Sequence, residues 1–156
     1  MQNAANYQAD GYHTATPYLI VSDATRAIDF YKRAFDATEV MRISAPGGKV
    51  GHAEIQIGDS RIMLADEAPQ CDARSPQTIG GTPVSLMLYV ENADATFARS
   101  VSLGAIALMP VKDQFYGDRS GTIADPFGHK WTIATHKEDV PPGELQRRAA
   151  ALFGHK

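Results

Sequence analysis

The chain has 156 residues, 44% of them hydrophobic and 21% charged, and its formal net charge is −3. These values fit one globular domain and argue against nucleic acid as a partner. No apolar run approaches the roughly 20 residues that cross a bilayer, and residues 1–14 lack the features of a signal peptide. The single cysteine, Cys71, excludes an intramolecular disulfide and lies in a predicted loop, where its role is open. We therefore expect a cytoplasmic protein without a membrane partner.

The first half of the chain predicts one strand, one helix and three further strands. Asp23 is a suitable helix N-cap, and apolar residues follow it at helical spacing between positions 27 and 35. Turns at Pro46–Gly48 and Gly58–Asp59 separate the later strands. The four strands are expected at Thr16–Ser22, Thr38–Ala45, Val50–Ile57 and Arg61–Ala65.

A long connecting loop, Asp66–Thr82, precedes a second copy of this pattern. The helix of the second half, Ala93–Leu103, is followed by Gly104, which is a natural helix stop. A short helix at Pro141–Phe153 closes the chain. The strands of this half are expected at Val84–Val90, Ala107–Val111, Thr122–Ala124 and Lys130–Thr135.

The two halves repeat with a period of about 69 residues. Val21 and Val90, which end the first strand of each half, are 69 positions apart, and so are Arg61 and Lys130 in the last strands. Because an internal duplication dictates the fold, we predict an α+β fold. In this fold two tandem βαβββ units form a curved mixed sheet with the helices outside.

Alternation along the strand Val84–Val90 assigns its two faces. The even-numbered residues of this strand are all large and apolar, and we expect them to pack under the helix. Ser85, Met87 and Tyr89 then face the other way. The concave surface that such faces enclose is the natural place for a ligand.

Several motifs resemble the vicinal oxygen chelate superfamily, which contains glyoxalase I, bleomycin-binding proteins, fosfomycin-modifying enzymes and extradiol dioxygenases. The segment Ala27–Ala37 is similar to the first helix of that superfamily, and Asp125–Gly128 resembles its DPxG turn. Phe115–Arg119 together with Gly128–Trp131 is more particular and resembles the PhnB-like branch. The resemblance implies a glyoxalase/bleomycin-resistance fold and, in solution, a homodimer.

The resemblance also divides the chain. Residues 15–137 are expected to form the superfamily domain, with its two modules at about 16–66 and 83–136. Residues 1–14 are then an N-terminal extension, and residues 138–156 are a C-terminal helical tail.

Metal-binding members of the superfamily place their ligands on the first and last strands of each half. The resemblance carries those positions onto Thr16, Met63, Ser85 and Thr132. Zn and Ni need imidazole, thiolate or carboxylate donors, which these four side chains do not offer. We therefore expect no divalent metal cofactor at these positions, and this argues against the metal-dependent chemistry of the family.

His52 and Glu54 are the sharpest remaining candidates for catalysis. They alternate with Ala53 and Ile55, so they are expected to share the concave face of their strand. His52 is then a candidate general base tuned by Glu54. The same pair is also compatible with a solvated or cross-paired strand face, with hydrogen bonds to a ligand, or with two ligands of a non-standard metal site.

Aromatic and sulfur-containing side chains on the concave face suit a flat, apolar ligand. They are equally compatible with simply filling the groove. Trp131 is in phase with Ile133 on the helix side, so we expect it in the core. The candidate ligand-binding residues of this kind are Tyr18, Met63, Met87 and Tyr89.

The segment Phe115–Arg119 is a second candidate for ligand binding. Phe115 and Tyr116 offer flat apolar area, and Arg119 offers a bidentate donor for a carboxylate or phosphate. Gly117 permits a close approach of the hairpin. The alternative is a purely structural hairpin, in which Asp118 and Arg119 pair with each other or fix the turn.

These features predict a metal-independent protein that binds a small molecule, as bleomycin-binding relatives do. The alternative is a small-metabolite enzyme of lyase, isomerase or transferase type. Such an enzyme would use His52 and Glu54 as acid and base or as ligands of a non-standard metal site. A third function is a subunit whose role is assembly. The sequence leaves open whether the protein is an enzyme and which molecule it binds.

Overall fold

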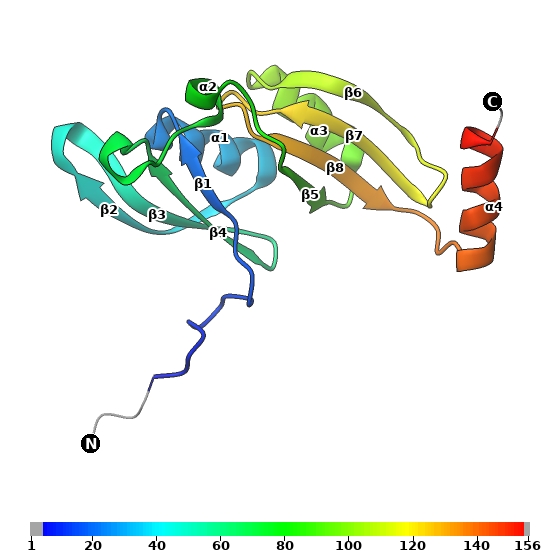
Figure 1. Ribbon diagram of the computed structural model, residues 1–156, viewed down its shortest axis with the longest axis horizontal. Coiled ribbons are helices and arrows are strands. Elements are labelled where there is room, and N and C mark those ends of the chain that lie inside the picture. The colour runs from blue at the N-terminus through cyan, green and yellow to red at the C-terminus, as the bar shows by residue number, and fades with distance from the viewer. Residues whose placement is uncertain (1–4, 155–156) are drawn as a thin grey trace. The chain divides into compact units, whose positions relative to one another are not determined.

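The computed structural model describes residues 5–154. The chain divides into two compact units, Met1–Gly81 and Thr82–Lys156, and each contains one βαβββ motif (Figure 1). The predicted α+β duplication is therefore confirmed. The first four residues of the expected N-terminal extension and the last two of the expected tail, His155 among them, lie outside the described residues.

Unit 1 is a four-stranded mixed sheet with a long helix, α1, against it. The strand order is β1-β4-β3-β2, with β1 parallel to β4 and the other neighbours antiparallel. A 3-10 turn at Pro46–Gly48 joins β2 to β3. The elements are β1 (Tyr18–Val21), α1 (Ala24–Phe35), β2 (Thr38–Ala45), β3 (Lys49–Ile57), β4 (Ser60–Asp66) and the short α2 (Pro76–Ile79).

Unit 2 repeats this topology. Its strand order is β5-β8-β7-β6, with β5 parallel to β8 and the other neighbours antiparallel. The helix α3 packs against β6, β7 and β8. The elements are β5 (Ser85–Tyr89), α3 (Ala93–Ser102), β6 (Ile106–Asp113), β7 (Asp118–Ala124), β8 (Lys130–His136) and a terminal helix, α4 (Pro142–Phe153).

The strand register repeats with the period found in the sequence. Tyr18 of β1 lies opposite Met63 of β4, and Met87 of β5 lies opposite Thr132 of β8. Each residue of the second pair is 69 positions after its counterpart in the first. The duplication therefore extends from the order of the elements to the pairing of individual residues.

The helices α1 and α3 begin in the same way, with two kinds of hydrogen bond. A side chain at the N-cap, Asp23 before α1 and Asn92 before α3, accepts a hydrogen bond from a backbone N–H of the first turn. The first helical N–H then donates to the last strand of the motif, to Asp66 at 2.7 Å in unit 1 and to Thr135 at 2.9 Å in unit 2. Both helix starts are thus fixed to their sheets by groups 69 positions apart.

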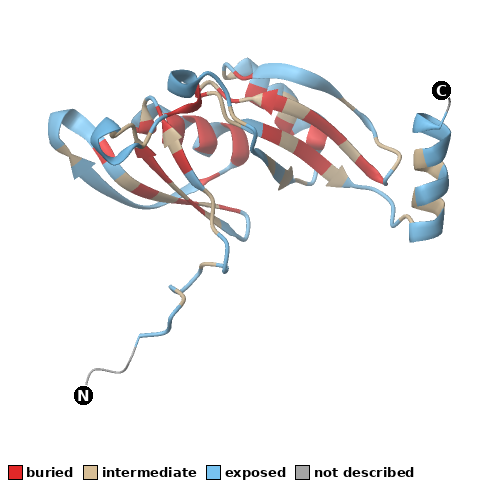
Figure 2. Cartoon of the chain, in the orientation of Figure 1, coloured by how far each residue is buried: buried red, intermediate tan, exposed pale blue. Residues whose placement is uncertain are grey.

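The core of each unit lies between its helix and its sheet (Figure 2). In α1 the predicted apolar positions are all buried, and Ile28 and Tyr31 are fully so. In unit 2, Trp131 and Ile133 of β8 are buried together with Ile123 of β7. The prediction that Trp131 belongs to the core is therefore confirmed.

Asp125 organises the turn between β7 and β8. Its carboxylate is 2% exposed and accepts hydrogen bonds from the backbone N–H groups of Phe127 and His129, at 2.9 and 3.0 Å. The indole N–H of Trp131 donates to the other carboxylate oxygen at 2.9 Å. One buried side chain therefore joins the DPxG turn to the core of unit 2.

Several element bounds differ from the sequence prediction. β7, for example, begins at Asp118, four residues before the expected start at Thr122. Val84 is 64% exposed instead of packing under α3, because β5 begins one residue later, where Ser85 pairs with Lys130 of β8. The expected loop Asp66–Thr82 also contains the short helix α2, which Ser75 caps by accepting from a backbone N–H. A serine followed by a proline is a helix-start signal that the loop-like composition of this segment concealed.

The helix α4 is tied to unit 2 by Arg148. The guanidinium contacts the carboxylates of Glu138 and Glu144 and donates to the backbone carbonyl of Phe115. The rings of Phe115 and Phe153 also meet edge to face. Within residues 5–154, every helix is too short or too polar to cross a bilayer.

Candidate functional site

Each sheet has one face that its helix does not cover, and we call it the open face. Strand alternation separates it from the helix side, and in unit 2 the open-face residues Asp118 and Ser120 are nevertheless buried. In unit 1 the open face carries Tyr18, His52, Glu54, Gln56, Arg61 and Met63. In unit 2 it carries Met87, Tyr89, Asp118, Ser120, Thr122, Thr132 and His136.

A chain of hydrogen bonds links three residues on the open face of unit 1. The Tyr18 hydroxyl lies 2.7 Å from Nδ1 of His52, and Nε2 of His52 lies 3.1 Å from a carboxylate oxygen of Glu54. Both ring nitrogens of the imidazole therefore have partners. The structure brings together three of the residues predicted from the sequence, with His52 between a phenol and a carboxylate.

Tyr12, which precedes β1, joins this group at its acidic end. Its ring lies under the guanidinium of Arg61, 5.5 Å from ring centroid to Cζ. Its buried hydroxyl lies beside the Glu54 carboxylate without a hydrogen bond of ordinary geometry to any described residue. Burial and the neighbouring Glu54 raise the pKa of Tyr12 to about 12. The Tyr12 hydroxyl and the His52 imidazole hold the pKa of Glu54 below its usual range.

The open face of unit 2 carries a different cluster. The Tyr89 hydroxyl donates to one carboxylate oxygen of Asp118 at 2.9 Å, and Nδ1 of His136 lies 2.7 Å from the other. Nε2 of His136 lies 2.8 Å from the exposed Asp139. Hydrogen bonds to Asp118 and Asp139 raise the pKa of His136. This cluster stabilises a protonated imidazole at the start of the connection to α4.

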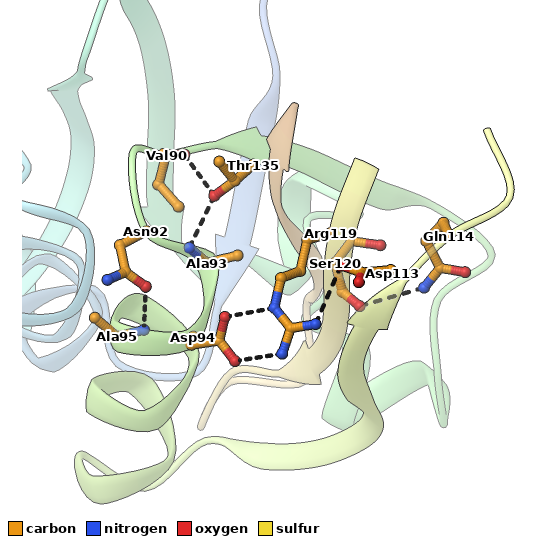
Figure 3. A network of polar contacts seen from close by, with 10 residues as sticks. All are labelled: Val90, Asn92, Ala93, Asp94, Ala95, Asp113, Gln114, Arg119, Ser120 and Thr135. Carbon is orange, nitrogen blue, oxygen red and sulfur yellow. Dashed lines mark hydrogen bonds and ion pairs between the residues drawn. The ribbon is translucent and has the colours of Figure 1, made fainter. Parts of the chain in front are cut away.

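Arg119 lies on the α3 side of its sheet and not on the open face. Its guanidinium forms a bidentate pair with Asp94 of α3, at 2.7 and 2.9 Å, and also contacts Asp113 at 3.1 Å (Figure 3). It alternates with Asp118, and Ile123 in phase with it is buried under the helix. The fork that we expected to hold a ligand anion is therefore occupied by carboxylates of the chain itself.

The rest of the segment Phe115–Arg119 makes contacts within unit 2. The rings of Phe115 and Tyr116 meet edge to face, and the Tyr116 hydroxyl lies 3.5 Å from the Ser120 hydroxyl. Gly117 has a φ of +102°, and a Cβ there would lie 2.1 Å from the carbonyl oxygen of Glu138. The close approach predicted for Gly117 is thus an approach to the segment that leads to α4.

The four positions carried over from metal-binding relatives lie at or beside the first and last strands. Thr16 precedes β1 and donates to the carbonyl of His13 at 3.3 Å, while Ser85 begins β5. The hydroxyl of Thr132 lies 3.1 Å from that of Thr122, and Met63 faces Tyr18. Among the described residues, no group of three or more His, Cys, Asp or Glu side chains is placed to hold a metal ion.

Sequence reasoning missed Tyr12 and His136. Tyr12 lies in a polar segment without periodicity, so no pattern connected it with Glu54. The predicted last strand ends at Thr135, so it leaves out His136, which follows Thr132 and Ala134 at the spacing of one strand face. Extending the predicted last strand by one residue would have placed it beside Asp118.

A model of the Glyoxalase/Bleomycin resistance protein/Dioxygenase superfamily matches residues 12–133. The chain therefore belongs to this superfamily, as the motifs in its sequence indicated. The match spans both βαβββ units. It identifies the scaffold but not the molecule that the scaffold serves, because this fold carries many functions.

The chain is also similar to particular proteins. An uncharacterized protein of Mycobacterium tuberculosis is 44% identical over 134 residues, which cover 84% of this chain and 79% of the relative. The solved structure of TioX from Micromonospora sp. ML1 is 26% identical with a TM-score of 0.62, covering 78% of this chain and 98% of TioX. That of a PhnB protein from Bacillus cereus is 22% identical with a TM-score of 0.61, covering 79% and 99%, and shows likeness of fold alone.

Proposed function

We propose that this protein binds a small, flat organic molecule on its open faces and needs no transition metal to do so. The observation that carries the proposal is the exposure of large side chains on the open faces of β1 and β5, which are edge strands of the two sheets. Tyr18, Met87 and Tyr89 are 48%, 49% and 60% exposed, although they lie on strands. Exposed aromatic and methionine side chains, such as Tyr18 in unit 1 and the neighbouring Met87 and Tyr89 in unit 2, are typical of surfaces that receive a ligand.

The donor chemistry supports binding without a metal. Hydroxyl groups such as those of Thr16, Ser85 and Thr132 are neutral at pH 7, and the thioether of Met63 is a soft ligand. They do not replace the water around Zn²⁺ or Ni²⁺. The segment Phe115–Arg119 and the turn at Asp125–Gly128 favour the PhnB-like branch of the superfamily.

A thermal-shift screen of neutral aromatic compounds, run in the presence of a chelator, tests the proposal. We expect hits whose stabilisation is reduced by Met87→Lys. The matched control is Ile79→Lys, because Ile79 is also exposed, at 59%, but lies on α2. The proposal would be contradicted if no compound stabilised the protein in the presence of the chelator, or if the two substitutions reduced the stabilisation equally.

A second candidate function is acid–base catalysis on a small metabolite. The hydrogen-bonded series Tyr18–His52–Glu54 favours it, because a carboxylate that holds an imidazole fixes its orientation and its tautomer. Turnover of a bound compound by the wild type, lost in His52→Gln while binding persists, would establish it. Binding without turnover in both proteins would leave the binding function alone.

We also propose that the protein forms a homodimer, as membership of the superfamily implies. The outer strands β2 and β6 support this, because both expose large apolar side chains, Ile43 at 52% and Met109 at 64% among them. Exposed apolar edge strands invite pairing with another chain. Sedimentation velocity should show a dimer at micromolar concentration, and a monomer there would refute this proposal.

A further inference from the structure

Tyr12 is held against the open face of unit 1 by its ring. The guanidinium of Arg61 covers that ring at 5.5 Å, and Arg61 is itself hydrogen-bonded to Gln56 of β3. Gly11 permits the approach, because its φ is +82° and a Cβ there would lie 3.1 Å from an Arg61 nitrogen. The side chain of Gln8 donates to the carbonyl of Tyr12. The contact is therefore specific, although it comes from a segment outside both sheets.

The polar end of Tyr12 fits less well than its ring. The hydroxyl is buried, yet it makes no hydrogen bond of ordinary geometry with the described residues. Buried polar groups nearly always have a partner, and an exception calls for an explanation. The Glu54 carboxylate acts on this hydroxyl, and one of its oxygens is already hydrogen-bonded to His52. The ring is thus well placed and the hydroxyl is not.

This arrangement has the form of a weak internal ligand. A phenol lies between a cation and a carboxylate, its ring stacked and its hydroxyl unsatisfied. A free phenol could take the same position and turn its hydroxyl fully toward Glu54, because no chain would restrain it. The raised pKa of Tyr12 and the lowered pKa of Glu54 mean that at neutral pH the first is a donor and the second an acceptor.

We propose that Tyr12 is a built-in plug on the open face of unit 1, and that the ligand displacing it is a neutral phenol whose hydroxyl donates to Glu54. The inference rests on the proposed binding function and names its ligand class and its regulation. An anionic ligand is disfavoured in this position, because burial and the Glu54 carboxylate outweigh the attraction of the Arg61 guanidinium, as the raised pKa of Tyr12 indicates. An aryl ether fits the space but has no proton to donate.

The test uses the full chain and p-cresol, which is the tyrosine side chain as a free molecule. Its dissociation constant is measured by NMR titration for the wild type and for Tyr12→Ala, with 4-methylanisole as the ether analogue. In the wild type the Tyr12 ring occupies the site in most molecules, and Tyr12→Ala removes this competition. If the ring is held only moderately, p-cresol should bind Tyr12→Ala about three- to tenfold more tightly than the wild type. The ether should gain much less.

Tyr7→Ala is the matched control, because Tyr7 belongs to the same segment and is 96% exposed. It should leave both dissociation constants unchanged. In Tyr12→Ala, a further change of Glu54→Leu, which removes the acceptor, should remove the preference of p-cresol over the ether. Amide spectra that match the wild type away from Tyr12 confirm that each variant is folded.

The outcomes separate this inference from the proposed function. Equal or weaker binding of p-cresol to Tyr12→Ala would overturn the plug while leaving the proposed function intact. Hits in the aromatic screen without any binding of p-cresol would have the same meaning. If no aromatic compound binds either protein, the proposed function and the plug both fail.

Discussion

Asp125 should be among the most sensitive positions of unit 2, because its buried carboxylate accepts three hydrogen bonds. A hydrogen bond to a charged group contributes about 1.5 kcal/mol or more, so Asp125→Ala should lower the free energy of unfolding by about 4 kcal/mol. Asp125→Asn keeps one oxygen for the two backbone donors but turns an NH₂ group toward the Trp131 indole. It should lower that free energy by about 2 kcal/mol.

Urea unfolding followed by tryptophan fluorescence measures these losses in the appropriate unit, because Trp131 is the sole tryptophan and belongs to unit 2. Asp113→Asn is the control, since the Asp113 side chain is 79% exposed and the ion pair that it forms with Arg119 lies at the surface. If Asp125→Asn proved no more destabilising than Asp113→Asn, the argument that this carboxylate joins the turn to the core would be wrong.

Three further predictions concern pH and metal. Hydrogen bonds from Thr78 and Ser75 lower the pKa of Glu67 to about 2, so its stabilising effect is present above the ordinary carboxyl pKa of about 4.3 and is lost as the pH falls toward 2. As the pH falls over that range, the melting temperature should therefore decrease more steeply in the wild type than in Glu67→Gln. An equal decrease in both proteins would contradict the stabilising role of Glu67. The pKa of His136 is raised, so its contribution to stability is present below about pH 6.5 and is lost as the pH rises through the raised value. In His136→Gln the melting temperature should therefore fall less steeply as the pH rises through that range. The same dependence of melting temperature on pH in both proteins would exclude this role. Elemental analysis of the purified protein should find no stoichiometric Zn or Ni, and a metal bound at Thr16 and Met63 would overturn the ligand argument.

The sequence predicted most of the scaffold because its signals are local or repeated. Helical spacing after Asp23 placed α1, and the period of 69 residues placed the second unit. The errors fell where local composition and pairing disagree. Val84 continues an apolar run but precedes the first pair between β5 and β8, and α2 is a single turn within a stretch of polar residues. The residue at which a strand begins or ends depends on pairing with strands that are distant in sequence, and the sequence of one strand does not indicate where that pairing begins.

The site was less predictable, because alternation gives a face but not a partner. It correctly placed Met87 and Tyr89 away from α3. It did not indicate that Arg119 would meet Asp94, because that pair joins β7 to a helix 25 positions earlier. Nor did it connect Tyr12 with Arg61, since the segment before β1 has no period that fixes where it runs.

The two units are alike at the positions that hold the helix starts and differ on their open faces. The positions that hold the helix starts, such as Asp66 and Thr135, supply an acceptor in both units, because a buried backbone N–H needs a partner in each. On the open faces that requirement is absent. Glu54 faces Met63 in unit 1, whereas the corresponding pair in unit 2 is Thr122 and Thr132. A carboxylate is charged and can take up a proton, whereas a threonine hydroxyl is neutral and does not. The two open faces therefore interact differently with a ligand. Tests of function should therefore substitute each open face separately.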